Sequence, residues 1–261
     1  MPFSDNLFVI MKKEKGKFVA FLKKIGGKAV DLLFPKNIKC VFCNNDVPDF
    51  ENKMICEECE NDLPFNNENK CGICSHPISN EAKICDICQK NKRYFKKAFC
   101  PFVYSGKVRK AILGYKDSNQ RWRAEFFSKY IFDEIKRSGL EFDFITFVPM
   151  TKKKLKRRGF NQAKLLAEEL SKLMNLPVQE IFTKKFDGKM QKFSTYKERQ
   201  ENVDGMYALL PMKLKRKSSI LIVDDIITSC ATVNACSKLV YKRVKSVYVC
   251  AVARNKLNFG V

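Results

Sequence analysis

The chain has 261 residues, of which 45% are hydrophobic, enough for one substantial core and a small additional module. Its 50 Lys and Arg residues against 28 Asp and Glu give a formal net charge of +22, which favours polyanionic partners, nucleic acid foremost. Because Lys far outnumbers Arg, a genome-wide bias in composition is the alternative explanation. The single histidine, His76, lies among cysteines, which argues against Ser-His-Asp and Cys-His hydrolases.

The first predicted element is a basic amphipathic helix at residues 12–33. Apolar residues such as Phe18, Leu22 and Ile25 recur at helical spacing, and lysines occupy the other faces. We expect this helix to pack on a neighbouring domain, with a membrane surface or a DNA backbone as the alternative partners. The apolar stretch at residues 7–11 is too short for a secretory signal, and no run is long enough to span a bilayer.

Four C-x-x-C units follow the helix. A two-residue gap lets both sulfurs of a pair face one ion, and four thiolates complete a tetrahedral structural zinc site, so the eight cysteines predict two Zn²⁺ ions. Sequential and interleaved pairing both remain open, and His76 is expected beside the ligands rather than among them. The eight predicted ligands are Cys40, Cys43, Cys56, Cys59, Cys71, Cys74, Cys85 and Cys88.

Disulfides in a secreted domain are the alternative to zinc. No signal peptide precedes the pairs, and four further cysteines lie scattered in apolar surroundings. We therefore expect a cytoplasmic protein with reduced cysteines, with peripheral attachment to the inner face of the membrane as an additional possibility.

The remainder of the chain alternates predicted strands and helices. A polar linker at residues 90–93 precedes a strand at 98–104, helical patterns at 107–114 and 125–136, and an apolar strand at 143–149. Such alternation is typical of an α/β domain with a mostly parallel sheet flanked by helices.

A basic segment follows the strand at 143–149. Six of the seven residues from 152 to 158 are Lys or Arg, and Gly159 comes next. We expect a loop that neutralises a pyrophosphate, with Gly159 giving the backbone freedom to approach it. The alternatives are a solvated charged loop and a nucleic-acid contact surface made by Lys152, Lys153, Lys154, Lys156 and Arg157.

The most informative segment is residues 219–232, where an apolar run leads into Asp224 and Asp225 and then into a turn rich in hydroxyl groups. The run predicts an interior parallel strand, whose ligands bind beyond its carboxyl end. The turn, residues 228–232, precedes a predicted helix at 231–241 and offers backbone N–H groups to a phosphate. The two acids are suited to sugar hydroxyls or to hydrated Mg²⁺. A plain strand-to-helix connection with two exposed acids is the alternative.

This segment is similar to the signature of type I phosphoribosyltransferases, which bind phosphoribosyl pyrophosphate. The resemblance assigns Asp224 and Asp225 to catalysis and the turn, made of Thr228, Ser229, Cys230, Ala231 and Thr232, to the 5-phosphate. Cys230 stands where that family usually has Gly, and a side chain there can weaken the phosphate cradle. No Walker A loop occurs in the sequence, which argues against an NTPase.

Further motifs resemble the ComF family, whose members carry a zinc ribbon before a phosphoribosyltransferase-like domain. The resemblance implies that Arg158, Gly159, Asn161 and Gln162 bind substrate. It also predicts three segments: an N-terminal extension at 1–36, a double zinc-ribbon module at 37–92 and a type I phosphoribosyltransferase-like α/β domain at 93–261. The motifs that carry it are residues 33–35 leading into Cys40 and Cys43, residues 104–116, Val148-Pro149, residues 158–162, Gln191, Arg199, residues 202–205, Asp224-Asp225 and residues 252–254.

The family implies a competence protein that binds phosphoribosyl pyrophosphate with Mg²⁺, contacts single-stranded DNA and serves DNA uptake in natural transformation, with the uptake machinery as a partner. Two alternatives stay open. One is an active phosphoribosyltransferase of nucleotide metabolism, in which the acids stabilise positive charge on the sugar while pyrophosphate leaves. The other is a zinc-ribbon nucleic-acid-binding protein whose transferase domain no longer binds its ligand, as Cys230 suggests.

Overall fold

The computed structural model describes residues 39–47, 54–67, 69–78, 82–117, 120–186, 203 and 205–256. The chain forms two compact units, Met1–Glu60 and Asn61–Val261. The helix predicted at residues 12–33 lies outside the described residues, as do Gln191, Arg199 and Asn202. The domain boundaries expected after residues 36 and 92 stay a prediction.

The first unit contains a cysteine knuckle and the start of helix α3 (Glu57–Asn61). The backbone N–H of Val41 donates to the carbonyl of Met54 at 2.8 Å, which joins the knuckle to the segment before the helix. The knuckle closes at Asn44, whose φ of 64° is a left-handed conformation that Asn tolerates well. Three glutamates in the first turn of α3 suit the positive end of its dipole.

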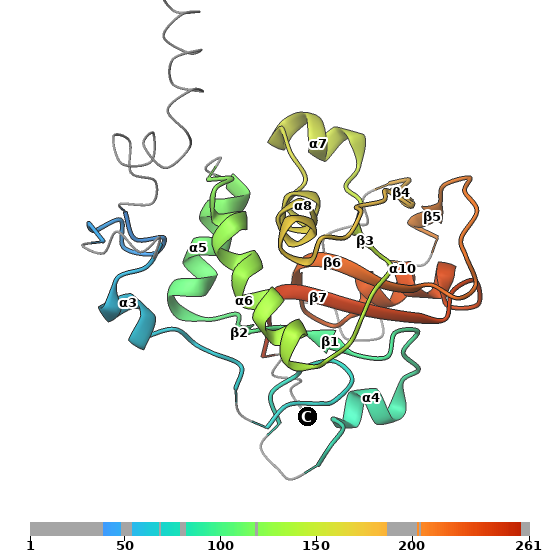
Figure 1. Cartoon of the computed structure of the whole chain (residues 1–261), viewed down its shortest axis with the longest axis horizontal. Coiled ribbons are helices and arrows are strands. Elements are labelled where there is room, and N and C mark those ends of the chain that lie inside the picture. Colours follow the sequence, from blue (N-terminus) through green and yellow to red (C-terminus); the bar gives the residue numbers. More distant parts are fainter. Residues whose placement is uncertain are drawn as a thin grey trace, which may run out of the picture. The chain divides into compact units, whose positions relative to one another are not determined.

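The second unit is built on a parallel sheet with strand order β1-β7-β6-β3, in which β2 also pairs with β7 (Figure 1). Every residue of β7 is buried, as expected for a strand covered on both faces. The strands are β1 (Ala98–Phe99), β2 (Phe102–Val103), β3 (Phe144–Phe147), β6 (Ser219–Ile227) and β7 (Ser246–Arg254). The predicted mostly parallel α/β architecture is confirmed.

Helices pack against this sheet through regularly spaced apolar residues. On α6 (Arg123–Arg137), Phe127, Ile131 and Ile135 recur every four residues and are fully buried. α6 contacts β7, and α8 (Gln162–Met174) contacts β3 and β6. α10 (Ala231–Val240) packs on β6 and β7 through a cluster that includes Ile220 and Ile222. α5 (Gly106–Asp117) leads into α6.

A second, smaller sheet pairs β4 (Phe182–Lys184) with β5 (Tyr207–Leu209) in antiparallel fashion. Lys184 lies opposite Tyr207 in this register, and its ammonium is 5.5 Å from the centre of the tyrosine ring. β5 contacts α10, so the small sheet belongs to the same unit as the main one.

The second cysteine knuckle is part of this unit too. Cys71 and Cys74 share one buried cluster with sheet residues, and helix α4 (Asp86–Lys90) carries Cys88. The hydroxyl of the buried Ser75 donates to the carbonyl of Ala98 at 2.6 Å. These contacts attach the knuckle to β1.

Two expected conformations are corrected. The basic segment is a helix, α7 (Lys152–Arg158), rather than a loop. The Thr151 hydroxyl accepts from the N–H of Lys154, and Gly159 ends the helix at φ 80°, so both ends are capped. The acidic strand also does not end at its carboxylates, because β6 continues to Ile227.

None of the described helices combines the length and the hydrophobicity needed to cross a membrane.

Candidate functional site

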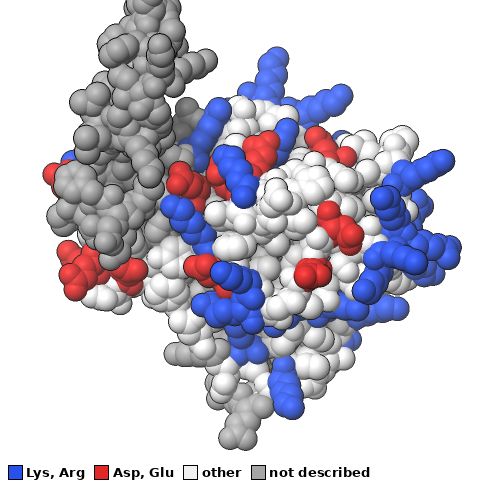
Figure 2. Space-filling view, in the orientation of Figure 1, with Lys and Arg blue, Asp and Glu red and all other residues white. Residues whose placement is uncertain are grey.

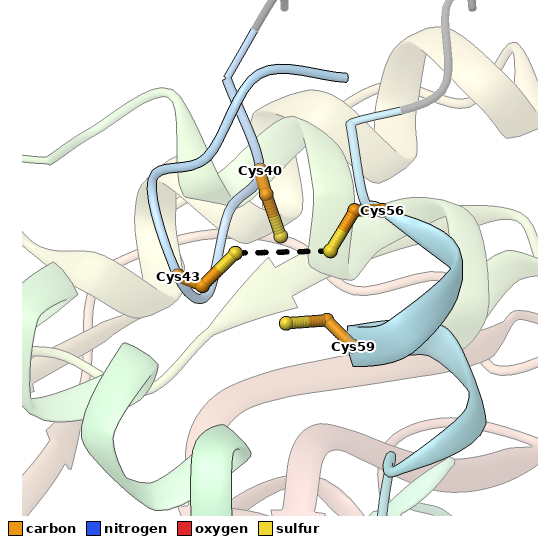
Figure 3. Close-up of side chains that lie close together, drawn as sticks. All are labelled: Cys40, Cys43, Cys56 and Cys59. Carbon is orange, nitrogen blue, oxygen red and sulfur yellow. Dashed lines mark hydrogen bonds between the residues drawn. The ribbon is translucent and has the colours of Figure 1, made fainter. Parts of the chain in front are cut away.

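The eight predicted ligands form two four-cysteine clusters. Site one comprises Cys40, Cys43, Cys56 and Cys59, and site two comprises Cys71, Cys74, Cys85 and Cys88. In each, the sulfur atoms lie within 4.8 Å of one another. The Sγ atoms of Cys43 and Cys56 are 3.7 Å apart (Figure 3), as are those of Cys74 and Cys85. A Zn–S bond of ~2.3 Å implies a tetrahedral edge of about 3.8 Å, so both clusters fit a structural zinc ion. The pairing is sequential.

His76 lies outside both clusters, as expected. Its carbonyl accepts a hydrogen bond from the N–H of the ligand Cys71 at 2.8 Å. Burial lowers the pKa of its imidazole, and the positive charge of Arg254 lowers it further. His76 therefore supports the knuckle through its backbone.

A cavity of about 320 Å³ lies at the carboxyl ends of β3 and β6, which are neighbours in the sheet. Residues of both strand ends line it, so the two strand tips share one crevice. The polar lining residues are Lys116, Lys154, Arg158, Asn161, Gln162, Lys184, Tyr207, Asp224, Asp225, Thr228 and Thr232.

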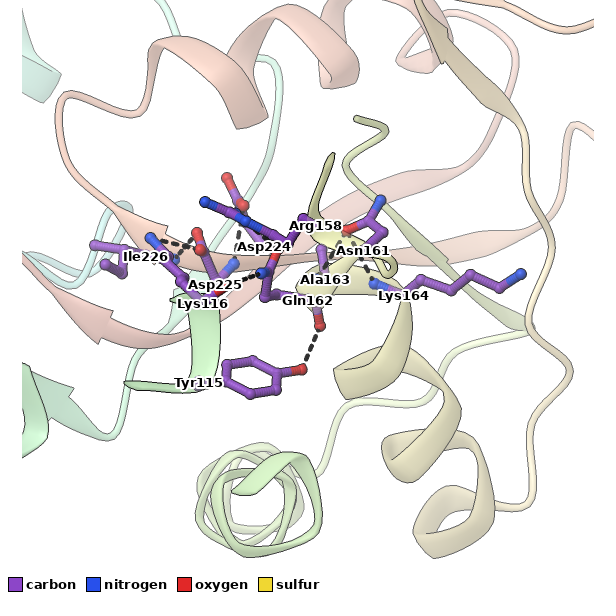
Figure 4. Close-up of polar contacts among 10 residues, drawn as sticks. All are labelled: Tyr115, Lys116, Arg158, Asn161, Gln162, Ala163, Lys164, Asp224, Asp225 and Ile226. Atoms are coloured by element: carbon purple, nitrogen blue, oxygen red, sulfur yellow. Dashed lines mark hydrogen bonds and ion pairs between the residues drawn. The ribbon is translucent and has the colours of Figure 1, made fainter. Parts of the chain in front are cut away.

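Asp224 and Asp225 both line the cavity, in different settings. Oδ2 of Asp225 lies 2.6 Å from Nζ of Lys116, at the end of α5 (Figure 4). The carboxylate of Asp224 accepts the N–H of Asp225 at 2.8 Å. Burial raises the pKa of Asp224, and the negative charge of Asp225 raises it further. Despite the cost of burial, Asp225 raises the pKa of Lys116, so the lysine stays charged.

Gln162, the first residue of α8, joins three segments around the cavity (Figure 4). Its side-chain oxygen accepts from Nη1 of Arg158 at 3.1 Å, and its amide nitrogen donates to the carbonyl of Lys116 at 3.4 Å. The hydroxyl of the buried Tyr115 donates to the carbonyl of Gln162 at 2.8 Å. Gln162 therefore links the end of α5 to the end of α7 beside the cavity.

Asn161 is the N-cap of α8 as well as a lining residue. Its Oδ1 accepts from the N–H of Ala163 at 3.0 Å, and its Nδ2 donates to the carbonyl of Val148 at 3.0 Å. The side chain therefore fixes the start of α8 relative to the end of β3.

Helix α7 divides the basic run between two faces. Lys154 and Arg158, four residues apart, lie on one face and line the cavity. Lys152, Lys153, Lys156 and Arg157 are exposed. Figure 2 shows Lys and Arg side chains projecting where α7 lies in Figure 1. Of the five residues predicted to meet nucleic acid, Lys154 thus lies on the cavity side.

Within the turn of residues 228–232, only Thr228 and Thr232 line the cavity. Ser229, Cys230 and Ala231 are buried, at 3%, 2% and 6% exposure. Cys230 has a φ of 65°, the left-handed conformation that explains why related signatures place Gly here. Gly159 also lies outside this cavity, because it serves as the cap of α7.

Three polar lining residues received no role from the sequence: Lys116, Lys184 and Tyr207. Lys116 lies in a segment that the family resemblance covers, so its motif was the available signal. Lys184 and Tyr207 belong to three-residue strands, which are too short for a periodic pattern.

The fold and the site define a zinc-ribbon protein whose α/β domain presents two carboxylates of β6 and four cationic side chains to one cavity. A family model described as "Double zinc ribbon domain" matches residues 29–89. The chain is 26% identical over 229 residues to "Competence protein F" of Haemophilus influenzae. The matched region covers 84% of this chain and 97% of the relative. The predicted resemblance to the ComF family is confirmed by this match.

Similar solved structures carry phosphoribosyltransferase names. Purine phosphoribosyltransferase from Pyrococcus horikoshii covers 52% of this chain and 84% of its own, with 15% identity and a TM-score of 0.33. Hypoxanthine phosphoribosyltransferase from Staphylococcus aureus covers 54% of this chain and 70% of its own, with 9% identity and a TM-score of 0.33.

Proposed function

We propose that this protein binds phosphoribosyl pyrophosphate with Mg²⁺ in the cavity at the ends of β3 and β6, and contacts single-stranded DNA through the exposed face of α7. The observation that carries the proposal is that side chains of both charges line one cavity. Four cationic side chains and two carboxylates line it: Lys116, Lys154, Arg158, Lys184, Asp224 and Asp225. A ligand with a sugar between two phosphate groups needs both kinds of side chain.

Each part of the ligand has a matching chemical environment. Asp224 and Asp225 would accept hydrogen bonds from ribose hydroxyls or hold Mg²⁺, since both offer carboxylate oxygens. Thr228 and Thr232 flank the start of α10, where hydroxyl and N–H groups favour a phosphate monoester. Lys154 and Arg158 would neutralise the diphosphate. The cavity volume of about 320 Å³ lies in the range of small-ligand sites.

Bound Mg²⁺ would neutralise the diphosphate and polarise its bonds. The acids of this chain would stabilise positive charge on the sugar if pyrophosphate left. Lys116 already compensates part of the acidic charge at Asp225. Whether an acceptor base or amine also enters would be tested by measuring pyrophosphate release with candidate acceptors.

Calorimetric titration with phosphoribosyl pyrophosphate and Mg²⁺ tests the binding. We expect heat with the wild-type protein and none with the double variant Asp224→Asn, Asp225→Asn. A matched control, Asp133→Asn with Glu141→Gln, makes the same charge change at exposed positions and should bind as the wild type does. A silent wild-type titration would favour the alternative of a nucleic-acid-binding protein with a non-binding transferase domain.

A role in DNA uptake is the cellular part of the proposal. It is supported by the similarity to Competence protein F and by the exposed basic face of α7. Loss of transformation in a strain carrying Ala at Lys152, Lys153, Lys156 and Arg157, with the protein still present at normal level, is the expected outcome. Normal transformation in that strain would remove the α7 face from the proposal.

A further inference from the structure

Arg254, the last residue of β7, joins zinc site two to the turn of residues 228–232, which contributes two lining residues to the cavity. It is only 2% exposed. Its Nε donates to the carbonyl of Cys74 at 3.0 Å, and its Nη2 lies 3.8 Å from the sulfur of the same residue. Its Nη1 donates to the carbonyls of Ile227, at 2.9 Å, and Thr228. One guanidinium thus holds both a zinc ligand and the start of the turn.

Cys230 belongs to the same buried core as zinc site two. It is buried at the N-cap of α10 and shares one cluster with Cys74 and the other three ligands of site two. Donors to a metal-bound thiolate orient it and strengthen metal binding, and Nη2 of Arg254 lies near enough to the sulfur of Cys74 to act in this way. The side chain that stands in the usual place of Gly is therefore packed with the zinc site and does not line the cavity.

The segment that follows zinc site two is also hydrogen-bonded to α10. The Oδ1 of Asn234, on the first turn of α10, accepts from the N–H of Tyr94 at 2.9 Å, and its Nδ2 donates to the carbonyl of Lys92 at 3.2 Å. Arg93, between them, donates from Nε to the sulfur of Cys88 at 3.3 Å. The segment that follows site two is therefore bonded both to a zinc ligand and to the helix that begins at the turn.

From these contacts we infer that zinc site two positions the turn of residues 228–232, with Arg254 as the positioning residue. The ligand in the cavity and the zinc at site two then stabilise each other, because coupling between two bound ligands is reciprocal. This inference rests on the proposed function for the identity of the ligand but not for the coupling itself. Site one, in the other compact unit, serves as the internal comparison.

The coupling can be measured without any ligand by hydrogen exchange at the amides of residues 227–232. We compare the full-length wild type with Cys85→Ser, Cys88→Ser, which removes two ligands from site two and leaves Cys74, Cys230 and Arg254 in place. Hydrogen exchange at the amides of the turn should become at least about tenfold faster, because the zinc site that supports the turn is lost. The matched variant Cys40→Ser, Cys43→Ser removes site one and should leave the turn unchanged.

A second pair of variants leaves all zinc ligands in place, so it tests the coupling even if the site-two variant fails to fold. Cys230→Ala removes a thiol that is buried in one cluster with the ligands of site two. By analogy with other groups that surround metal ligands, this change should speed zinc release to a chromogenic chelator from one of the two sites by about tenfold. Cys236→Ala removes another buried thiol of the same helix and should release zinc at the wild-type rate.

Phosphoribosyl pyrophosphate with Mg²⁺ should slow zinc release from site two of the wild type and not from site one. If that ligand has no effect because it does not bind at all, the proposed function fails, and the exchange and release comparisons still decide the coupling. Unchanged exchange in the site-two variant, together with wild-type zinc release from Cys230→Ala, would overturn the inference and leave site two as a fold-stabilising element only.

Discussion

Nζ of Lys116 lies 2.6 Å from Oδ2 of Asp225, so a cation from the end of α5 is placed on one of the two strand-end acids. The ammonium occupies the neighbourhood in which carboxylate oxygens would hold a divalent cation. Two positive charges so close together repel each other, and Lys116 is too buried for water to screen that repulsion fully. Lys116 is therefore expected to compete with a metal ion at the strand end.

Replacing Lys116 by Met should strengthen divalent cation binding to the protein alone. Removal of the ammonium leaves Asp224 and Asp225 uncompensated, and a gain of about 1.4 kcal/mol would tighten binding tenfold. Mn²⁺ titration followed by electron paramagnetic resonance measures this affinity. Lys154→Met, which removes another cation that lines the cavity, is the control for a general loss of positive charge. Equal Mn²⁺ affinities in the wild type and Lys116→Met would show that the metal binds elsewhere.

Neutralising the two acids one at a time should change stability in opposite directions. Asp224→Asn should raise the melting temperature by about 2–4 °C, equivalent to about 1 kcal/mol, because a carboxylate with a raised pKa is costly to bury in its charged form. Asp225→Asn should lower the melting temperature by at least as much, because it removes the partner of the Lys116 ammonium. Thermal unfolding of the ligand-free proteins gives both values.

The pH dependence provides a separate test of Asp224. Its raised pKa means that the folded protein holds this proton more tightly than the unfolded chain does. The resulting stabilisation is fully present below the ordinary aspartate pKa of about 3.9 and is lost as the pH rises through the folded value. The advantage of Asp224→Asn over the wild type should therefore be small near pH 4 and grow towards pH 8. A difference independent of pH would show that Asp224 is not the titrating group.

Local patterns were sufficient to predict the parts of the site that lie close together in sequence. The C-x-x-C spacing predicted the zinc knuckles, and the apolar run before Asp224 predicted an interior parallel strand. The basic segment at 152–158 has no hydrophobic period, so its sequence favours a loop over a helix. The capping residues Thr151 and Gly159 were the signals for a helix there.

Contacts between distant segments could not be predicted in this way. Nothing in the local sequence pairs Lys116 with Asp225, or places Arg254 between Cys74 and Thr228. Those pairs form because α5 and the second knuckle pack around the strands of the parallel sheet, and that packing involves the whole unit. Asn234 shows the limit most clearly, since its partners Tyr94 and Lys92 lie 140 and 142 residues earlier in the chain.

Metal analysis should find two zinc ions per chain in protein purified under reducing conditions. Both clusters have the sulfur separations of a tetrahedral site, so each should fill independently of the other. Cys40→Ser, Cys43→Ser and Cys85→Ser, Cys88→Ser should each retain one ion. A wild-type content of one ion or none would contradict the assignment of two structural zinc sites.

The two faces of α7 should separate DNA binding from binding in the cavity. Ala at the exposed residues Lys152, Lys153, Lys156 and Arg157 should weaken binding to labelled oligothymidylate and flatten its salt dependence. Each phosphate contact to a single strand contributes about 0.7 to the slope of log affinity against log salt, so four lost contacts would reduce the slope by about 3. Fluorescence anisotropy over a series of KCl concentrations measures it.

The cavity-side pair supplies the matched comparison for that experiment. Lys154→Ala with Arg158→Ala removes two positive charges from the same helix, but from the face that lines the cavity. This variant should keep a salt slope close to that of the wild type and lose most of the calorimetric response to phosphoribosyl pyrophosphate. The two variants can be compared by the change in the DNA salt slope divided by the number of charges removed. If this value were the same for both, the DNA contact would depend on the total charge of α7 and not on its exposed face.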